Sequence, residues 1–260
     1  MRIVVNADDF GASLETVQAT IASFERGALT SATIMVTMPA ASEALAFARS
    51  HPEHSFGVHL TFVGDGVERP ESDPVQIPGL VDDRGFLRST RSVRLRGLIG
   101  TLSVAQIERE VEAQLGLARE HGIPISHVDS HRHLHKLGPF REALRRVLPG
   151  FGVTRVRNVQ DVFLQRPLRA ATYWIGPLWR RRLMSAFMTT EHFYMPASTG
   201  DVDWAQQLLS RLEGLDGSLE VGVHPGLDED WRREEAASAQ AFALGARERG
   251  HALVSWGEVP

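Results

Sequence analysis

Short runs of β-branched and other apolar residues recur along the chain, and this recurrence limits the fold more than any other feature of the sequence. Each run has the length and composition of a buried strand. The predicted strands cover residues 3–6, 32–37, 56–61, 125–129, 153–157, 219–223 and 252–255.

Between most of these runs, apolar residues recur every three or four positions, as in amphipathic helices. Capping residues and glycines place four such helices at residues 13–27, 103–122, 201–212 and 231–249, with a capping box expected at Ser103 and the third helix starting at Asp201. Strands that alternate with helices form a parallel sheet with helices outside it. The chain is therefore predicted to be an α/β protein, an irregular (β/α) barrel of the TIM type, with residues 1–260 in a single domain.

The segment 64–101 interrupts this pattern, because it is rich in Pro, Gly, Asp and Arg and has no clear periodicity. We expect it to form a long loop over the mouth of the barrel, not a linker between domains.

Composition limits the partners and the location that can be expected. The net charge of -4 gives no general field that would attract nucleic acid or an anionic membrane. Cysteine is absent, which excludes disulfides and thiolate metal ligands. The first residues turn acidic at Asp8, so no signal peptide is expected, and no apolar run approaches the roughly 18 residues of a membrane span. A cytoplasmic protein fits these features.

Polar residues stand at the ends of four predicted strands. Asp8 and Asp9 follow the first strand, His59 lies in the third, Asp129 ends the fourth, and His224 follows the strand at 219–223. The carboxyl ends of parallel strands surround one mouth of a barrel, so these side chains should converge. Carboxylates and imidazoles from separate strands are ligands for a hard or borderline divalent cation.

The densest polar feature is the run from 127 to 135, which holds four histidines and one aspartate. Alternate residues of an extended segment share a face, so all five are expected to point the same way: His127, Asp129, His131, His133 and His135. The alternative is a histidine-rich surface loop, and the strand that leads into the run argues against it.

The other candidates also have ordinary structural explanations. Adjacent aspartates often form a turn or a helix cap, a lone His59 in an apolar strand is usually a hydrogen-bonded core residue, and Pro225 after His224 could mark only a turn. Their shared position at strand ends favours function. Neighbouring carboxylates disfavour joint ionisation, so we expect one aspartate to bind a metal and the other to take a proton from water.

Five segments together resemble the YdjC-like carbohydrate deacetylases, the family of the chitooligosaccharide and hopanoid-pathway deacetylases. They are residues 6–11 (NADDFG), 29–33 (LTSAT), 57–60 (GVHL), 127–135 (HVDSHRHLH) and 223–225 (VHP), in the order and spacing of the family. No single segment is specific, but the combination is.

This resemblance implies a distorted β/α barrel that hydrolyses the N-acetyl group of an N-acetylglucosamine-type sugar to free amine and acetate. Asp9, His59 and His131 would hold a divalent ion, with Mg²⁺ the first choice and Zn²⁺ the alternative, and Asp8 matches the general base. The acetylated sugar, as a chitooligosaccharide, a glycolipid or a nucleotide-linked sugar, is the implied partner.

Amide cleavage also requires that the departing nitrogen gain a proton. We expect His224 to donate it, because it comes from a different strand and can approach from the opposite side. The remaining members of the histidine run are expected to orient the ligand imidazoles or to bind sugar hydroxyls: His127, Asp129, His133 and His135.

The segment 162–190 is basic and aromatic, with five arginines and no acidic residue. It predicts either a surface helix and subunit contact or a site for an anionic group on the substrate. The aromatic residues Tyr173, Trp174 and Trp179 favour a homodimer.

Two other functions remain open from the sequence. One is a metal-dependent sugar isomerase or phosphoesterase on a similar barrel, which usually needs more carboxylates or a catalytic lysine than this chain offers, since Lys136 is its one lysine. The other is a non-catalytic sugar-binding protein, which has no use for an adjacent base and metal ligand.

Overall fold

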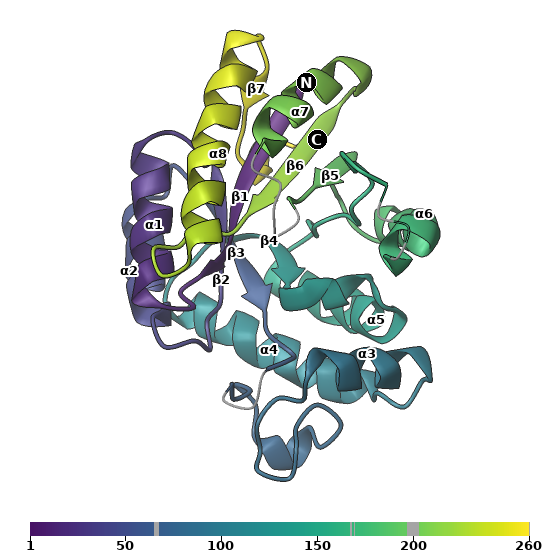
Figure 1. The fold of residues 1–260 in the computed structure, drawn as a ribbon. Helices are drawn as coiled ribbons and strands as arrows, with labels where there is room; N and C mark the ends of the chain where they lie inside the picture. Colours follow the sequence, from purple (N-terminus) through teal and green to yellow (C-terminus); the bar gives the residue numbers. More distant parts are fainter. Residues whose placement is uncertain (65–67, 167, 169, 197–202, 260) are drawn as a thin grey trace.

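Seven parallel strands form one sheet at the centre of the computed structural model of this chain (Figure 1). The structure describes residues 1–64, 68–166, 168, 170–196 and 203–259. The strands are β1 (Arg2–Phe10), β2 (Ser31–Ile34), β3 (Ser55–Leu60), β4 (Ile125–Ser130), β5 (His192–Tyr194), β6 (Ser218–Val223) and β7 (Ala252–Leu253).

Neighbouring strands pair in the order β4–β3–β2–β1–β6–β5, and β7 also pairs with β1. All of these pairings are parallel. Two isolated parallel bridges, Val128 with Val156 and Arg155 with Met188, continue the sheet beyond β4. The sheet therefore curves into a half-barrel that short irregular segments extend, and the predicted α/β barrel fold is confirmed.

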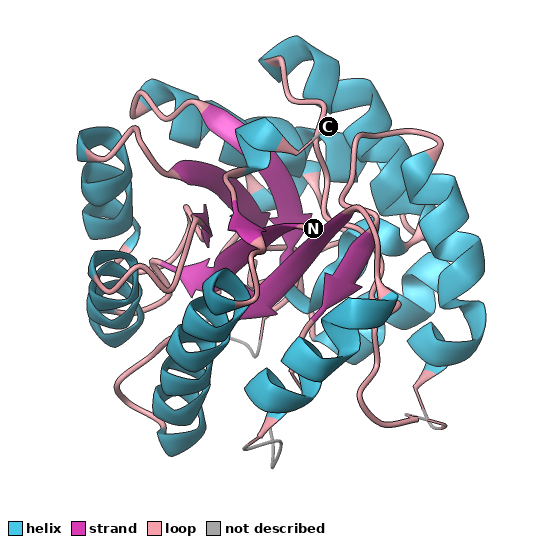
Figure 2. Ribbon diagram, turned by 90° about the horizontal axis from the view of Figure 1, so that it is seen from above, coloured by secondary structure: helices cyan, strands magenta, loops and turns pink. Residues whose placement is uncertain are grey.

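Helices surround this sheet, as the view from above shows (Figure 2). None of the helices described is long and apolar enough to cross a membrane. The helices are α1 (Leu14–Glu25), α2 (Ala41–Ser50), α3 (Thr90–Leu98), α4 (Val104–Glu120), α5 (Gly138–Val147), α6 (Ala171–Met184), α7 (Trp204–Arg211) and α8 (Asp230–Glu248), with a short 3-10 segment, η2 (His131–Lys136), after β4.

Alternate residues of β1, β2, β3 and β6 have largely opposite chemistry. One set is apolar and belongs to the main hydrophobic core, between the strands and the helices: Ile3, Val5 and Ala7 of β1, Val58 and Leu60 of β3, and Leu219 and Val221 of β6. The intervening set is polar and buried inside the barrel: Asn6, Asp8, Thr33, His59, Asp129 and Glu220. A shift of one residue in any strand would exchange these sets, so the alternation fixes the register and places the polar residues together.

The interior of the barrel near the amino ends of the strands is filled by a second, smaller hydrophobic cluster of Val4, Val254, Trp256 and Val259. The ring of Trp256 stacks on His127, with ring centroids 4.5 Å apart. A Cβ at Gly57 would lie 2.5 Å from the carbonyl oxygen of His127, so only glycine fits there. The barrel interior is therefore closed at this end.

Six of the seven predicted strands are present, and the differences have physical reasons. Residues 153–157 make only single bridges and form no strand. Strand β5, which was not predicted, is three residues long and too short to show periodicity. Asp8 and Asp9 lie inside β1 and not after it.

Three of the predicted helices correspond to α1, α4 and α8. The predicted start of the third helix at Asp201 lies outside the described residues, and α7 begins at Trp204. The capping box predicted at Ser103 is wrong, since that side chain makes no capping hydrogen bond. The segment 64–101 contains α3, which buries only Val93 and therefore lacks a detectable apolar stripe.

Candidate active site

A bulge at the end of β1 brings two consecutive aspartates to the same side. The pairing of β1 with β2 shifts register between Ala7 and Phe10. Asp9 has a φ of 58°, in the left-handed region that Asp and Asn tolerate better than most residues. Such an irregularity re-aims a side chain. Asp8 and Asp9 therefore both reach the barrel mouth, which regular strand alternation would forbid.

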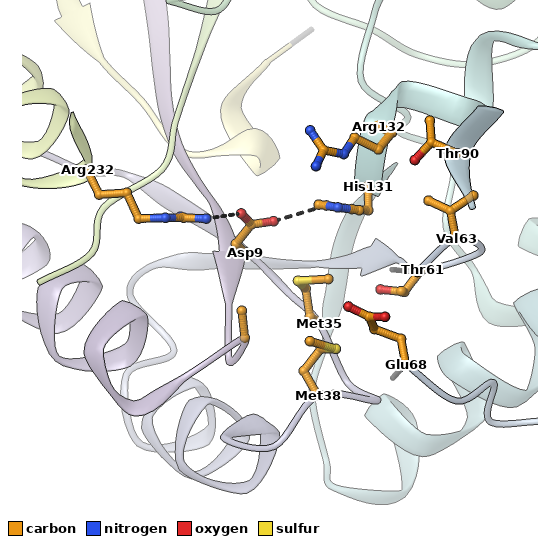
Figure 3. A pocket seen from close by; sticks show the side chains of 12 residues that line it. Asp9, Met35, Met38, Thr61, Val63, Glu68, Thr90, His131, Arg132 and Arg232 are labelled. Atoms are coloured by element: carbon orange, nitrogen blue, oxygen red, sulfur yellow. Dashed lines mark hydrogen bonds and ion pairs between the residues drawn. The ribbon is translucent and has the colours of Figure 1, made fainter. Parts of the chain in front are cut away.

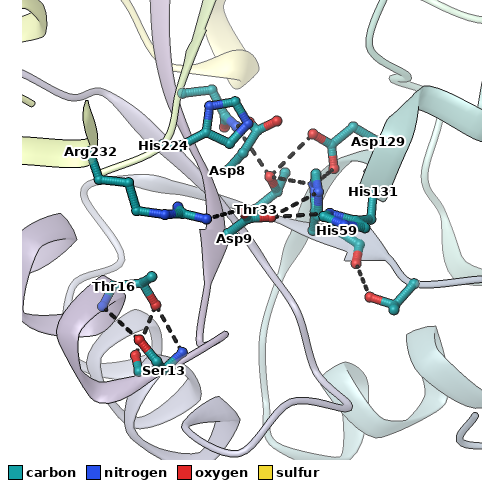
Figure 4. Close-up of polar contacts among 12 residues, drawn as sticks. Asp8, Asp9, Ser13, Thr16, Thr33, His59, Asp129, His131, His224 and Arg232 are labelled. Atoms are coloured by element: carbon teal, nitrogen blue, oxygen red, sulfur yellow. Dashed lines mark hydrogen bonds and ion pairs between the residues drawn. The ribbon is translucent and has the colours of Figure 1, made fainter. Parts of the chain in front are cut away.

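Asp9 lies between two imidazoles and a guanidinium (Figures 3 and 4). Its Oδ1 atom is 3.5 Å from Nε2 of His59 and 3.3 Å from Nδ1 of His131. Its Oδ2 atom accepts a hydrogen bond of 2.9 Å from Arg232. Burial raises the pKa of Asp9, but the contact with His131 and the charges of His224 and His59 outweigh it and hold this pKa well below its usual range.

His59 is oriented by a carboxylate behind it. Its Nδ1 atom lies 2.7 Å from Oδ1 of Asp129, and the hydroxyl of Thr33 donates to Oδ2 of Asp129 at 3.2 Å. When Nδ1 carries the proton for this contact, the Nε2 lone pair of the neutral ring points at Asp9. Burial lowers the pKa of His59, but Asp129, with Asp8 and Asp9, raises it above its usual value.

The histidine run does not stay extended, so the expectation that its alternate residues share one face is wrong beyond residue 130. Strand β4 ends at Ser130, and η2 follows, with positive φ at Arg132 and His133. This turn brings His131 to Asp9.

The other members of the run separate. Asp129 contacts His59, and His133 lines the cleft described below. His135 is buried, with Nδ1 2.8 Å from the hydroxyl of Ser130. His127 lies deeper in the barrel against Trp256 and does not line the cleft. Of the four residues expected to support the site or to bind sugar, two therefore lie at it.

Asp8 is held by a buried arginine that the sequence analysis missed. Arg157 donates to both oxygens of Asp8, at 2.5 and 2.6 Å, and also contacts Asp129 at 2.5 Å and Glu220 at 2.6 Å. Burial raises the pKa of Asp8, but the charge and hydrogen bonds of Arg157 outweigh it and lower this pKa to about 2. Asp8 is therefore ionised at neutral pH.

Glu220 is the third carboxylate on Arg157, and its environment differs. Its Oε1 atom accepts from Arg157, whereas Oε2 is buried and has no hydrogen-bond partner among the described residues. Burial raises its pKa to about 7 despite the opposing charge of Arg157.

His224 comes directly after β6 and is positioned by Glu235 of α8. Oε1 of Glu235 accepts from the backbone N–H of His224 at 2.6 Å and lies 3.0 Å from its Nδ1 atom. Burial lowers the pKa of His224, but Glu235, Asp9 and Asp8 outweigh it and raise this pKa to about 9. The ring is therefore protonated at neutral pH.

These residues open into one cleft of about 940 Å³. Its lining includes all five side chains to which a catalytic or metal-binding role was assigned: Asp8, Asp9, His59, His131 and His224. A smaller cavity of about 130 Å³ lies beside Asp9 and is lined by Met35, Met38 and Thr61 (Figure 3).

The residues missed by the sequence analysis are Arg157, Glu220, Arg232 and Glu235. Arg157 ends a predicted strand and Glu220 interrupts an apolar one, so both carried a signal: a charge within a segment expected to be buried. Arg232 and Glu235 lie in the first turns of a helix with a polar exterior, where charged residues are ordinary.

The donors around Asp9 fit a divalent cation. Asp9, His59 and His131 offer ligand atoms that all lie within 4.8 Å of one another. Oδ1 of Asp9 is buried and has no hydrogen-bond partner among the described residues, although two imidazole nitrogens face it. A lone pair that faces a carboxylate oxygen is repelled unless a cation or a proton lies between them.

Comparison with known proteins agrees with this arrangement. The family described as YdjC-like protein matches residues 2–255. A carbohydrate deacetylase of Brevibacillus brevis is 36% identical over 88% of this chain and 83% of its own length. A carbohydrate deacetylase of Thermoanaerobacter pseudethanolicus is 28% identical over 88% of this chain and 82% of its own length.

The solved structure of a protein from Enterococcus faecalis V583, described as a cellobiose-phosphate cleavage protein, superposes with a TM-score of 0.80 at 22% identity and covers 98% of this chain and 97% of its own. It supports the fold alone. The match of the family to nearly the whole sequence confirms the resemblance carried by the five short segments, and the chain belongs to the YdjC-like protein family.

Proposed function

We propose that this protein is a metal-dependent deacetylase that hydrolyses the N-acetyl group of an acetylated amino sugar. The observation that carries the proposal is the meeting, in one cleft, of an ionised aspartate, a protonated histidine and a three-residue cation site. The chain is a hydrolase of amide or ester bonds in sugars, as its relatives named carbohydrate deacetylase indicate. Its predicted cytoplasmic location is part of the proposal.

The two proton transfers of amide hydrolysis are assigned to Asp8 and His224. A bound divalent ion would polarise the acetyl carbonyl and acidify the attacking water. Asp8 accepts a proton from that water, and Arg157 keeps its carboxylate oriented while it does so. The Nδ1 side of His224 faces Glu235, so its Nε2–H is the donor for the departing nitrogen. Asp8 lies in β1 and His224 follows β6, so the proposed base and acid reach the cleft from different strands.

Asp9, His59 and His131 are expected to bind one divalent ion per chain. His131→Ala should lose it, because one of three ligands is removed. Asp9→Asn is the cleaner test of the carboxylate, since Asn tolerates the left-handed φ of 58° as Asp does, whereas most residues would add strain. Metal analysis after reconstitution with Mg²⁺ and, separately, Zn²⁺ measures the effect, and two imidazoles favour the softer zinc over magnesium. Unchanged metal content in His131→Ala would remove that residue from the ligands.

The deacetylation rate is expected to fall as the pH rises toward and past about 9, because His224 loses its proton there. A raised pKa means that the acid form is complete below that value and is lost as the pH rises through it. Glu235→Gln removes the carboxylate that raises this pKa, so the alkaline limb of the kcat/KM profile should move to lower pH. His224→Ala should lower the rate of amide hydrolysis by about 10²–10⁴ with the metal retained. Equal losses on an amide and an acetate ester would contradict the acid role, because an alcohol needs less help to leave.

The substrate is tested by acetate release from N-acetylglucosamine in free, oligomeric, lipid-linked and nucleotide-linked form, with each metal added. Release of acetate from any of them supports deacetylation. Binding of a glycan with no acetate formed would contradict it and favour the sugar-binding function.

A further inference from the structure

Helix α6 exposes an apolar stripe that no part of the described chain covers. Trp174, Ile175 and Leu178 follow the i, i+1, i+4 spacing of one helix face, and they are 65%, 41% and 51% exposed. Leu168 extends the stripe, since it is 61% exposed and its carbonyl oxygen accepts a hydrogen bond from the indole of Trp174. The helix lies at the periphery of the fold, beside β5 (Figure 1). Exposed apolar patches of this kind usually contact something.

The same helix face continues into positive charge. Arg181 and Arg182 stand seven and eight residues after Trp174, on the same side, and both are exposed. Neither forms an ion pair within the described residues. Burial lowers the pKa of Arg141 on α5, and the charge of the nearby Arg182 lowers it further. Five arginines and no acidic residue between 162 and 190, in a chain of net charge -4, make this segment locally cationic.

The opposite side of α6 is fixed to the protein. Leu183 is fully buried, and Trp179 packs against the main core with the ammonium of Lys136 5.3 Å from its ring. The exposed stripe is therefore held rigidly outward, and its exposure does not come from a helix detached from the fold.

We infer that the outer face of α6 docks on the surface of an anionic lipid bilayer. Trp, Ile and Leu beside arginines are the residues with which interfacial helices enter the headgroup region, and anionic lipids attract the adjacent cations. A second copy of the chain, the predicted homodimer, fits less well. A twofold contact through this face would bury the arginines of both copies, with no carboxylate in the stripe to pair them.

Docking there would bring the bilayer next to the cleft. The hollow beside α6, of about 740 Å³, is lined by Tyr173 and Trp174 and shares Gln160, Phe163 and Thr172 with the cleft that holds Asp8 and Asp9. If the proposed deacetylation holds, a substrate anchored in the membrane could reach the cleft without leaving the bilayer.

Flotation of the full chain with vesicles of phosphatidylcholine, with and without phosphatidylglycerol, tests the docking and needs no activity. The protein should partition onto the vesicles that contain phosphatidylglycerol and much less onto pure phosphatidylcholine. Arg181→Gln with Arg182→Gln should weaken this partition by about thirtyfold, or about fivefold for each arginine. Trp174→Ser should weaken it by about tenfold.

Arg145→Gln with Arg146→Gln is the matched control, because it removes the same charge from arginines that Glu142 already pairs. It should leave the partition unchanged. Equal binding to both kinds of vesicle, no binding, or equal losses in the two double variants would overturn the inference. A dimer in light scattering that Trp174→Ser dissolves, without vesicle binding, would assign the face to a second copy. Hydrolysis of a soluble acetylated sugar by the unaltered protein is measured beside flotation, so failure of docking and failure of deacetylation give different results.

Discussion

Replacement of Arg157 by methionine is expected to reduce the free energy of unfolding by about 3–5 kcal/mol, the usual cost of breaking a buried ion pair from one side. Arg157 is fully buried and contacts three carboxylates, those of Asp8, Asp129 and Glu220. Without its charge, the carboxylates repel one another in a medium that screens poorly. Denaturant unfolding of the metal-free protein measures the loss.

The pH dependence of that loss identifies its cause. Burial already raises the pKa of Glu220 to about 7 with Arg157 in place. Removing the guanidinium takes away the charge that lowers the pKa values of Glu220 and Asp8. A carboxyl whose pKa is raised by folding destabilises the fold as the pH rises above its unfolded value. The variant should therefore approach the wild type as the pH falls, and Arg157→Lys should lose less. A loss that is the same at every pH would point to lost packing.

Asp8→Asn is expected to reduce deacetylation by about 10²–10⁴, because the amide cannot accept the proton of water. The metal content should be retained, since the proposed ligands are Asp9, His59 and His131. Asp9→Asn provides the contrast, because this variant should bind the metal more weakly, whereas Asp8→Asn should retain it. Rates measured with the metal in excess, beside metal analysis of both variants, separate the two roles.

One structural complication must be controlled in that experiment. Both oxygens of Asp8 accept from Arg157, and an amide can replace only one of them. Asp8→Asn should therefore also lower the free energy of unfolding. Its rate should be measured only at temperatures at which the thermal unfolding curve shows that the variant is folded. Equal metal loss in the Asp8 and Asp9 variants would contradict the division of labour between them.

The strands and their direction could be predicted from the sequence because buried apolar runs are a strong local signal. The convergence of Asp9, His59 and His131 followed from the rule that parallel strands end at one mouth. Two features could not be predicted. The bulge at Asp9 is a backbone irregularity of a single residue, and the turn at Arg132 depends on positive φ in residues other than glycine.

The carboxylate cluster around Arg157 was missed for another reason. Its members come from β1, β4, β6 and the bridge region near residue 156, so their proximity depends on strand order. Strand order is not a local property of the sequence. Arg232 and Glu235 present the same difficulty, because a helix that looks solvated turns its first residues toward the mouth.

The filled floor of the barrel has a consequence for turnover. Trp256 and His127 fill the interior beneath the carboxylates, so a substrate would reach them from the cleft and not through the floor of the barrel. In a deacetylation, the acetyl group would point inward and the sugar outward. Acetate would then be formed behind the amine product and could depart only after the sugar had moved aside. The sugar product would therefore leave before acetate. Added acetate should then bind the sugar-free enzyme in competition with the next substrate.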